Sequence, residues 1–323
     1  MNYEKETLIK NIRKLAITKQ LSFLIGSGTS VPAVPLMDSV EGENLEERNE
    51  NLKNIVKQVS TKMVDNKEDR VTGLVLNDYV RFITSIINIL NLSNSRQTPK
   101  TINLFSTNYD LFIEKAVDVL MRTYKFVFND GASGYFNRIL DSSNYNKTVS
   151  YKGLNDNYTN EIPSITLIKP HGSINWEIDK DRALIRNYVT DSPLIVRPTG
   201  KEENETFMDN HFHEMLRVFQ LELDKPQSVL FVIGFSFQDS HIAKMVRRAI
   251  QNPELIVYIF GFNDDDEKKI LNNLKLGKDI RNLILLTPKD FNENYKNNDN
   301  FTLSNLTDIL NGSSLEDLKD DQA

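Results

Sequence analysis

The chain alternates between short, continuous apolar runs and segments in which apolar residues recur every three or four positions. Continuous runs are typical of strands buried on both faces of a parallel sheet, and the longer spacing is typical of amphipathic helices. The apolar runs that predict strands are LSFLI (21–25), INLF (102–105), VLFVI (229–233), and those within SITLIKPH, ELIVYIF and NLILL.

Helical spacing follows or precedes most of these runs. It covers the first twenty or so residues, 111–120, the segment ETFMDNHFHEMLRVFQLEL and 240–250. The order strand, polar turn, helix therefore recurs along the chain, which is the unit of a doubly wound sheet. We predict an α/β fold, a Rossmann-like doubly wound parallel sheet.

Other segments change character without breaking this order. Residues 41–98 are polar and charged, yet carry apolar positions at helical spacing, so they predict a helical insertion. The Asn-rich stretch 137–160 predicts a loop region, and 311–323 a flexible polar tail. Residues 1–323 are accordingly expected to form a single domain that contains this insertion.

Polar turns with unusual residues follow the strands. They read GSGTS (26–30), STNYD (106–110), PHGS (170–173) and GFSFQDSHI (234–242), with GFN (261–263) as a candidate fifth. Ligands of an open parallel sheet bind beyond the carboxyl ends of its strands. We therefore expect these turns to converge on one site, although GSGTS lacks the third glycine of a dinucleotide-binding fingerprint.

Each turn also has a structural explanation. Gly26 and Gly28 would also suit a tight turn and close helix packing, and Asn108 would also suit a helix N-cap. A lone histidine such as His171 is more often structural, but its place at the ligand edge favours chemistry. His241 lies just inside a helix, which favours packing, and His211 and His213 are two apart on a helix, which argues against a metal pair.

Composition narrows the function classes. The 39 Lys and Arg against 45 Asp and Glu give a net charge of −6, so direct nucleic-acid binding is not expected. The chain has no cysteine, which excludes disulfides, thiol catalysis and cysteine-based zinc sites. The charged N-terminal segment has no apolar leader, and no window reaches the length of a membrane span, so we expect a cytoplasmic protein without membrane contact.

Taken in order, GSGTS, STNYD, NDGASG, PHGS and GFSFQDSHI resemble the sirtuin-like NAD hydrolases of bacterial anti-phage defence, such as the sirtuin-like subunits of Thoeris-type and HerA-associated systems. The resemblance extends over nearly the whole chain. It implies a sirtuin-type Rossmann fold in which NAD+ lies across the sheet edge as substrate.

The resemblance also implies roles for single residues. Asn108 and His171 fall on the catalytic positions, with Asp110 in support. The residues expected to contact NAD+ lie in the glycine turn, at the end of the next strand and around the adenosine half of the dinucleotide. They are Gly26, Ser27, Gly28, Thr29, Ser30, Thr107, Gly234, Phe235, Ser236 and Asn263.

The departures from the family matter as much. Protein-deacylating sirtuins continue the glycine loop with an AGIPDFR-like stretch and carry a four-cysteine zinc ribbon, whereas this chain continues VPAVPLMDSV and has no cysteine. No zinc is therefore expected, and deacylation is a lesser alternative to NAD+ hydrolysis. The resemblance further implies a regulated NAD-depleting effector that forms a homo-oligomer or assembles with a HerA-type ATPase or other defence-system partner.

The residue types fit hydrolysis of a cationic substrate. Most glycosidases need a carboxylic acid to protonate a poor leaving group, but nicotinamide leaves NAD+ as a neutral ring. An Asn amide would position water and the ribose, and a neutral His would accept a proton. The other candidate is a catalytically silent NAD or ADP-ribose sensor that recruits a partner.

Overall fold

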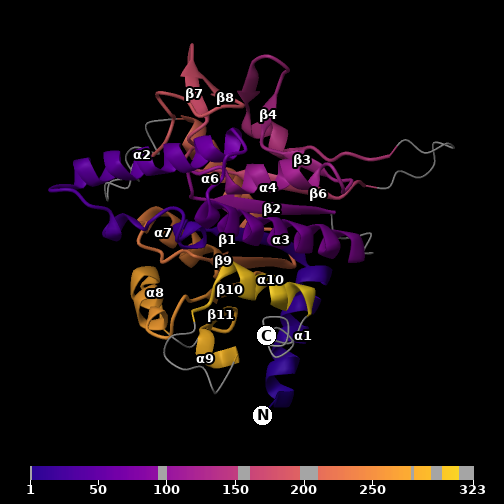
Figure 1. Cartoon of the computed structure of the whole chain (residues 1–323). Helices are drawn as coiled ribbons and strands as arrows, with labels where there is room; N and C mark the ends of the chain where they lie inside the picture. Colours follow the sequence, from indigo (N-terminus) through magenta and orange to yellow (C-terminus); the bar gives the residue numbers. More distant parts are fainter. Residues whose placement is uncertain are drawn as a thin grey trace.

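The computed structural model describes residues 2–93, 100–151, 161–196, 210–277, 280–291 and 300–312. Within them, seven parallel strands form one sheet in the order β11-β10-β9-β1-β2-β6-β3 (Figure 1). The strands are β1 (Gln20–Ile25), β2 (Thr101–Ser106), β3 (Val127–Asn129), β6 (Ser164–Ile168), β9 (Ser228–Ile233), β10 (Ile256–Phe260) and β11 (Leu283–Leu286). The predicted Rossmann-like α/β fold is confirmed.

Helices cover both faces of this sheet. One face carries α1 (Asn2–Thr18), α2 (Leu45–Val64), α3 (Arg70–Leu92), α4 (Phe112–Leu120), α9 (Pro288–Phe291) and α10 (Leu303–Asn311). The other carries α6 (Asn210–Leu223), α7 (Ser240–Ala249) and α8 (Asp266–Leu274). Successive strand residues enter different cores, as Phe23 packs with the first group and Leu24 with the second. Each apolar run therefore fills two cores at once, which explains why it does not alternate.

Helix α3 corrects the expectation that no window reaches the length of a membrane span. By length and composition alone, Arg70–Leu92 could cross a membrane, but half of its apolar window is buried within the protein. Phe82, Ile83 and Ile86 are fully buried in the core beneath the sheet. The apolar face of α3 is thus explained by packing inside this domain.

A second, smaller sheet was not foreseen. Strands β4 (Ala132–Ser133), β5 (Arg138–Leu140), β8 (Arg182–Ile185) and β7 (Trp176–Asp179) pair antiparallel in that order and lie beyond β6 in Figure 1. The prediction of a loop over 137–160 was wrong for β5 and for the 3-10 turn η3 (Ser142–Asn146), while 152–160 lie outside the described residues. These strands have two to four residues, too few for an apolar run to register.

The C-terminal helix α10 was also not predicted from the sequence. In α10, the side chains of Thr302 and Asn305 form a capping box, and Gly312 ends the helix in a left-handed conformation with φ of 79°. Of the predicted tail 311–323, residues 313–323 lie outside the described residues.

Candidate functional site

The strand order places the five polar turns side by side. The turns follow β10, β9, β1, β2 and β6, which are consecutive neighbours in the parallel sheet and so end at the same edge. The chain runs outward from β1 through β2 and later returns to β9 on the other side of β1. Such a reversal of strand order is where doubly wound sheets bind ligands.

The glycine turn differs from the prediction in one respect. Residues Ser27–Ser30 form a single 3-10 turn, η1, and the next α-helix, α2, begins only at Leu45. The general order of strand, polar turn and helix is therefore not followed here, because no α-helix begins directly behind the glycine turn. Pro32 and Pro35 explain this, because proline lacks an N–H and disfavours helical backbone in the residue before it.

Glycines let the turn after β1 pack directly against the turn after β9. A Cβ on Gly26 would lie 2.3 Å from the carbonyl oxygen of Gly234, and one on Gly234, whose φ is +65°, would lie 2.7 Å from the Thr29 nitrogen. The amides of Gly26, Gly28 and Thr29 already donate to backbone carbonyls. Close backbone approach, rather than helix packing, accounts for these glycines.

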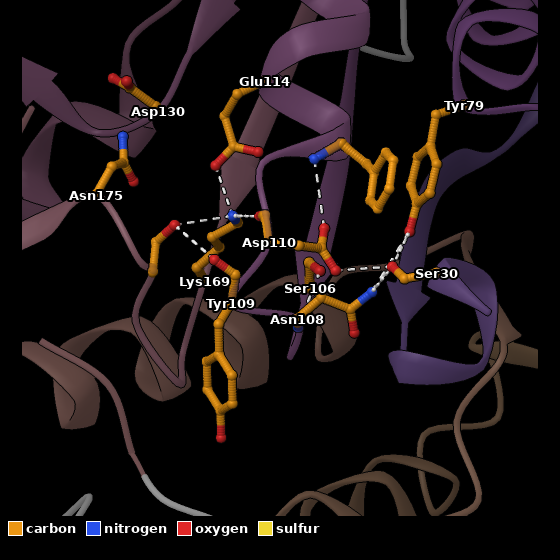
Figure 2. A network of polar contacts seen from close by, with 12 residues as sticks. Ser30, Tyr79, Ser106, Asn108, Tyr109, Asp110, Glu114, Asp130, Lys169 and Asn175 are labelled. Atoms are coloured by element: carbon orange, nitrogen blue, oxygen red, sulfur yellow. Dashed lines mark hydrogen bonds and ion pairs between the residues drawn. The ribbon is translucent and has the colours of Figure 1, made fainter. Parts of the chain in front are cut away.

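The side chain of Asn108 is held at this junction from one side. It is 5% exposed, and its Nδ2 donates to Gly26 O at 3.1 Å, Ser30 Oγ at 3.2 Å, Thr29 Oγ1 at 3.3 Å and Tyr79 Oη at 3.4 Å. Figure 2 shows the amide pointing at Ser30 and Tyr79, with its oxygen turned away. Within the described part of the chain, no donor reaches Oδ1, although it is buried.

Asp110, rather than Asn108, accepts from an amide at the start of α4, whose N-cap position is Leu111. Asp110 Oδ1 accepts from the Phe112 amide at the start of α4, and its Oδ2 accepts from Ser30 Oγ at 2.7 Å. Burial raises the pKa of the Asp110 carboxyl, while the Lys169 ammonium and the Ser30 hydroxyl act in the opposite direction. Asp110 therefore joins the turns after β1 and β2.

A buried lysine joins the turns after β2 and β6. Lys169, 1% exposed, places Nζ 2.6 Å from Asp110 O, 3.0 Å from Ser173 Oγ and 2.6 Å from Glu114 Oε1 (Figure 2). Burial raises the pKa of Glu114, against the pull of Lys169. All three ammonium protons thus have acceptors, which is what a buried charge requires.

His171 lies beside a carboxylate from another turn. It is 8% exposed, and its Nε2 is 2.9 Å from Oδ2 of Asp239, a close approach without the alignment of a directed hydrogen bond. Asp239 Oδ1 caps α7 by accepting from the amides of His241 and Ile242. Burial acts to raise the pKa of Asp239, but His171 and these amides outweigh it, so that this pKa lies below its usual value.

The remaining predicted contacts lie around this centre. Thr107 donates its amide to Ile25 O at 3.1 Å, beside the glycine turn. The rings of Phe235 and Phe237 meet edge to face at 5.0 Å, and Ser236 is exposed. Asn263 Oδ1 accepts from the amides that open α8, so its side chain serves as a cap.

Two surface cavities have neither Asn108 nor His171 in their lining. One is lined by Glu177, Ile178, Asp179, Arg186 and 192–194, and the other by Arg13, 88–89, 91–92 and 310–311. In the described ranges, no group of three or more His, Cys, Asp or Glu could hold a metal ion.

Sequence reasoning missed four residues of this centre. They are Tyr79, Glu114, Lys169 and Asp239. Asp239 stood in a quoted motif and before a helix, which was a usable signal. Tyr79 and Glu114 sit within helical patterns, and a lysine is rarely buried, so nothing local distinguished them.

Comparison with known proteins supports the sequence motifs. A family model described as a SIR2-like domain matches residues 103–302, which is more than half of the chain, and domains of this kind use NAD. The matched region begins within β2, so the glycine turn and Tyr79 lie outside it. A comparison with curated proteins gave no match.

Proposed function

This chain belongs to the SIR2-like domain family, and we propose that it is an NAD+ hydrolase that releases nicotinamide and ADP-ribose. The observation that carries the proposal is Asn108, whose buried Oδ1 has no partner among the described residues and lies at the switch-point edge of the sheet. An orphaned buried acceptor costs free energy unless a ligand satisfies it. A bound substrate or water would do so.

The reaction needs no acid for its leaving group. The bond from the ribose anomeric carbon to the pyridinium nitrogen breaks, its electron pair goes to that nitrogen, and nicotinamide leaves neutral. Water oxygen bonds to the anomeric carbon and gives up a proton. The protein must therefore hold the ribose, place the water and accept one proton, without the paired carboxylates of most glycosidases.

Asn108 and His171 suit these tasks. The Asn108 Oδ1 accepts a hydrogen bond from the water or from a ribose hydroxyl without adding charge. The His171 imidazole accepts the proton, and Asp239, anionic and 2.9 Å away, stabilises the imidazolium that forms. Asp110 supports the site by anchoring Ser30.

The glycine turn and neighbouring strand ends would bind the rest of the dinucleotide. Gly26 to Ser30 and Thr107 would contact the pyrophosphate and ribose, and Gly234 to Ser236 with Asn263 the adenosine half. The amides of Gly26, Gly28 and Thr29 are engaged in the described arrangement, whereas Ser27 is exposed. Binding through the first three amides would require the turn to rearrange.

Protein deacylation is a less well supported function for this chain than NAD+ hydrolysis. A chain without cysteine cannot build the four-cysteine zinc ribbon beside a peptide groove. Nicotinamide release that depends on an acyl-peptide would support it.

The second candidate function is a catalytically silent NAD or ADP-ribose sensor. The burial of Asn108 and His171, 5% and 8% exposed, favours it, because a substrate reaches these side chains only after neighbouring groups move. The same burial suits a hydrolase that stays inactive until triggered, as a toxic NAD-consuming enzyme must.

The proposed cellular role rests on the sequence resemblance. In this proposal the protein is a cytoplasmic, NAD-depleting effector of anti-phage defence that acts as a homo-oligomer or with a HerA-type ATPase. Light scattering across a concentration series tests the first form, since a monomer at every concentration would contradict self-assembly.

The deciding experiment follows nicotinamide release from NAD+ by the purified chain over a concentration series, beside His171→Ala. The hydrolase proposal predicts release that the variant abolishes while remaining folded by circular dichroism. Calorimetric binding of NAD+ without release, even with a partner present, would favour the sensor. Undiminished release by His171→Ala would contradict the proposed base.

A further inference from the structure

Tyr79 on α3 lies against the amide of Asn108, although nothing in the sequence motifs or the matched family region includes it. The side chain is fully buried, and its ring stacks on Phe112 with centroids 5.3 Å apart and planes 5° apart. Its hydroxyl is 2.7 Å from Thr29 Oγ1 and 3.1 Å from Ser30 Oγ. A phenylalanine would fill nearly the same space, so the hydroxyl needs its own explanation.

Counting protons fixes the direction of each hydrogen bond in this cluster. Thr29 Oγ1 lies 2.7 Å from Gly26 O, which can only accept, so the Thr29 proton goes there. Ser30 Oγ lies 2.7 Å from the Asp110 carboxylate, so the Ser30 proton goes to Asp110. Tyr79 must then donate its proton to Thr29 Oγ1, or share it with Ser30 Oγ. Burial raises the pKa of Tyr79, which keeps that proton in place.

Each hydroxyl that faces the Asn108 amide has therefore committed its proton elsewhere, and the remaining oxygen, a backbone carbonyl, has none. The four oxygens are Gly26 O, Thr29 Oγ1, Ser30 Oγ and Tyr79 Oη, which we call the oxygen wall. Only an N–H group can face this wall favourably. The amide nitrogen of Asn108 must point toward it, and Oδ1 must point away.

We propose that Tyr79 is a positioning residue, which locks the oxygen wall so that Asn108 presents its carbonyl oxygen, an acceptor, to a hydrogen-bond donor of the substrate. This rests on the proposed NAD+ hydrolysis, where the donor is a ribose hydroxyl or the attacking water. Helix α3 thereby contributes to the site from within the segment 41–98.

The kinetic test uses Tyr79→Phe, which keeps the ring and removes one oxygen. We expect kcat for nicotinamide release to fall about tenfold, the equivalent of one hydrogen bond, with KM for NAD+ within about twofold of wild type. Tyr145→Phe is the matched control, because Tyr145 is also buried and also makes one hydroxyl hydrogen bond, to Asp130 O. A wild-type kcat for Tyr79→Phe, or an equal loss in Tyr145→Phe, would overturn the proposal.

A stability test does not depend on activity. Asn108→Asp is isosteric but has no N–H for the oxygen wall, so near pH 8 it should unfold at a lower urea concentration than Asn108→Ala. The difference between these two urea concentrations should be smaller when both variants also carry Tyr79→Phe, which removes one oxygen of the oxygen wall. An Asn108→Asp protein as stable as Asn108→Ala, or a difference unchanged by Tyr79→Phe, would overturn the positioning role. If the wild-type chain releases no nicotinamide even with a partner present, the proposed function fails, and this second test still decides the role of Tyr79.

Discussion

The turns after β2 and β6 lie at neighbouring strand ends, but each is held by different physics. Asn108, after β2, faces the oxygen wall, whose neutral oxygens allow its side-chain amide only one orientation. His171, after β6, lies against the Asp239 carboxylate, and the nearby Lys169 and Glu114 form a buried ion pair. The first turn is thus specified by hydrogen-bond direction and the second by charge.

This difference has consequences for stability. Neutral hydrogen bonds contribute modestly to the free energy of unfolding, and their contribution depends little on pH. A buried charge that loses its partner lowers the free energy of unfolding by much more. Substitutions that leave a buried charge without its partner should therefore cost the most stability, and substitutions around His171 should respond more to pH than substitutions around Asn108.

Lys169→Met should produce the largest effect on stability, a loss of about 3 to 5 kcal/mol, because it leaves the Glu114 carboxylate buried without its partner. Urea denaturation measures it. Lys169→Met combined with Glu114→Leu should recover much of the loss. Lys10→Met removes one partner of the exposed Lys10–Glu6 pair and should change stability by less than about 0.5 kcal/mol. Equal losses of stability for Lys169→Met and Lys10→Met would refute the claim that the buried ion pair matters more than the exposed one.

Gly26→Ala tests the backbone contact on which the Asn108 turn depends. The added methyl would lie 2.3 Å from Gly234 O, so the turns after β1 and β9 must separate, at a cost of about 2 kcal/mol in the free energy of unfolding. The control is Gly73→Ala in α3, where no atom lies within 4 Å of the new Cβ. It should stabilise the protein by about 0.5 to 1 kcal/mol. Two substitutions of the same sign would contradict close packing at Gly26.

Asp239→Asn should have the smallest effect and a distinctive pH profile. Asparagine caps helices as well as aspartate, so the substitution removes only the charge facing His171. Because the pKa of Asp239 is lowered in the folded protein, its contribution is present above the unfolded value and lost as pH falls through the folded value. The stability difference from wild type, about 1 kcal/mol at pH 6, should therefore start to shrink near pH 4, where the unfolded carboxyl titrates, and vanish only below the lowered folded pKa. A difference that persists at lower pH would rule out the ionic explanation.

The sequence predicted the sheet well because strands such as 229–233 are buried on both faces and appear as continuous apolar runs. The polar turns at their ends were also visible, since a parallel sheet brings them to one edge. The oxygen wall was not, because Tyr79 occupies an ordinary apolar position of a helix and its hydroxyl partners are 49 and 50 residues away along the chain. Lys169 was missed because only the folded structure shows its three acceptors.

The central claim is that Asn108 acts on NAD+ through its unpartnered oxygen. The most direct test compares nicotinamide release by wild type, Asn108→Ala and Asn103→Ala. Asn103 is the matched control, since it is also a buried asparagine and lies on β2, just before the Asn108 turn, but its amide donates to Glu222. The account predicts release by wild type and Asn103→Ala, and a loss of about a hundredfold to a thousandfold in Asn108→Ala. Release by Asn108→Ala at the wild-type rate would contradict it.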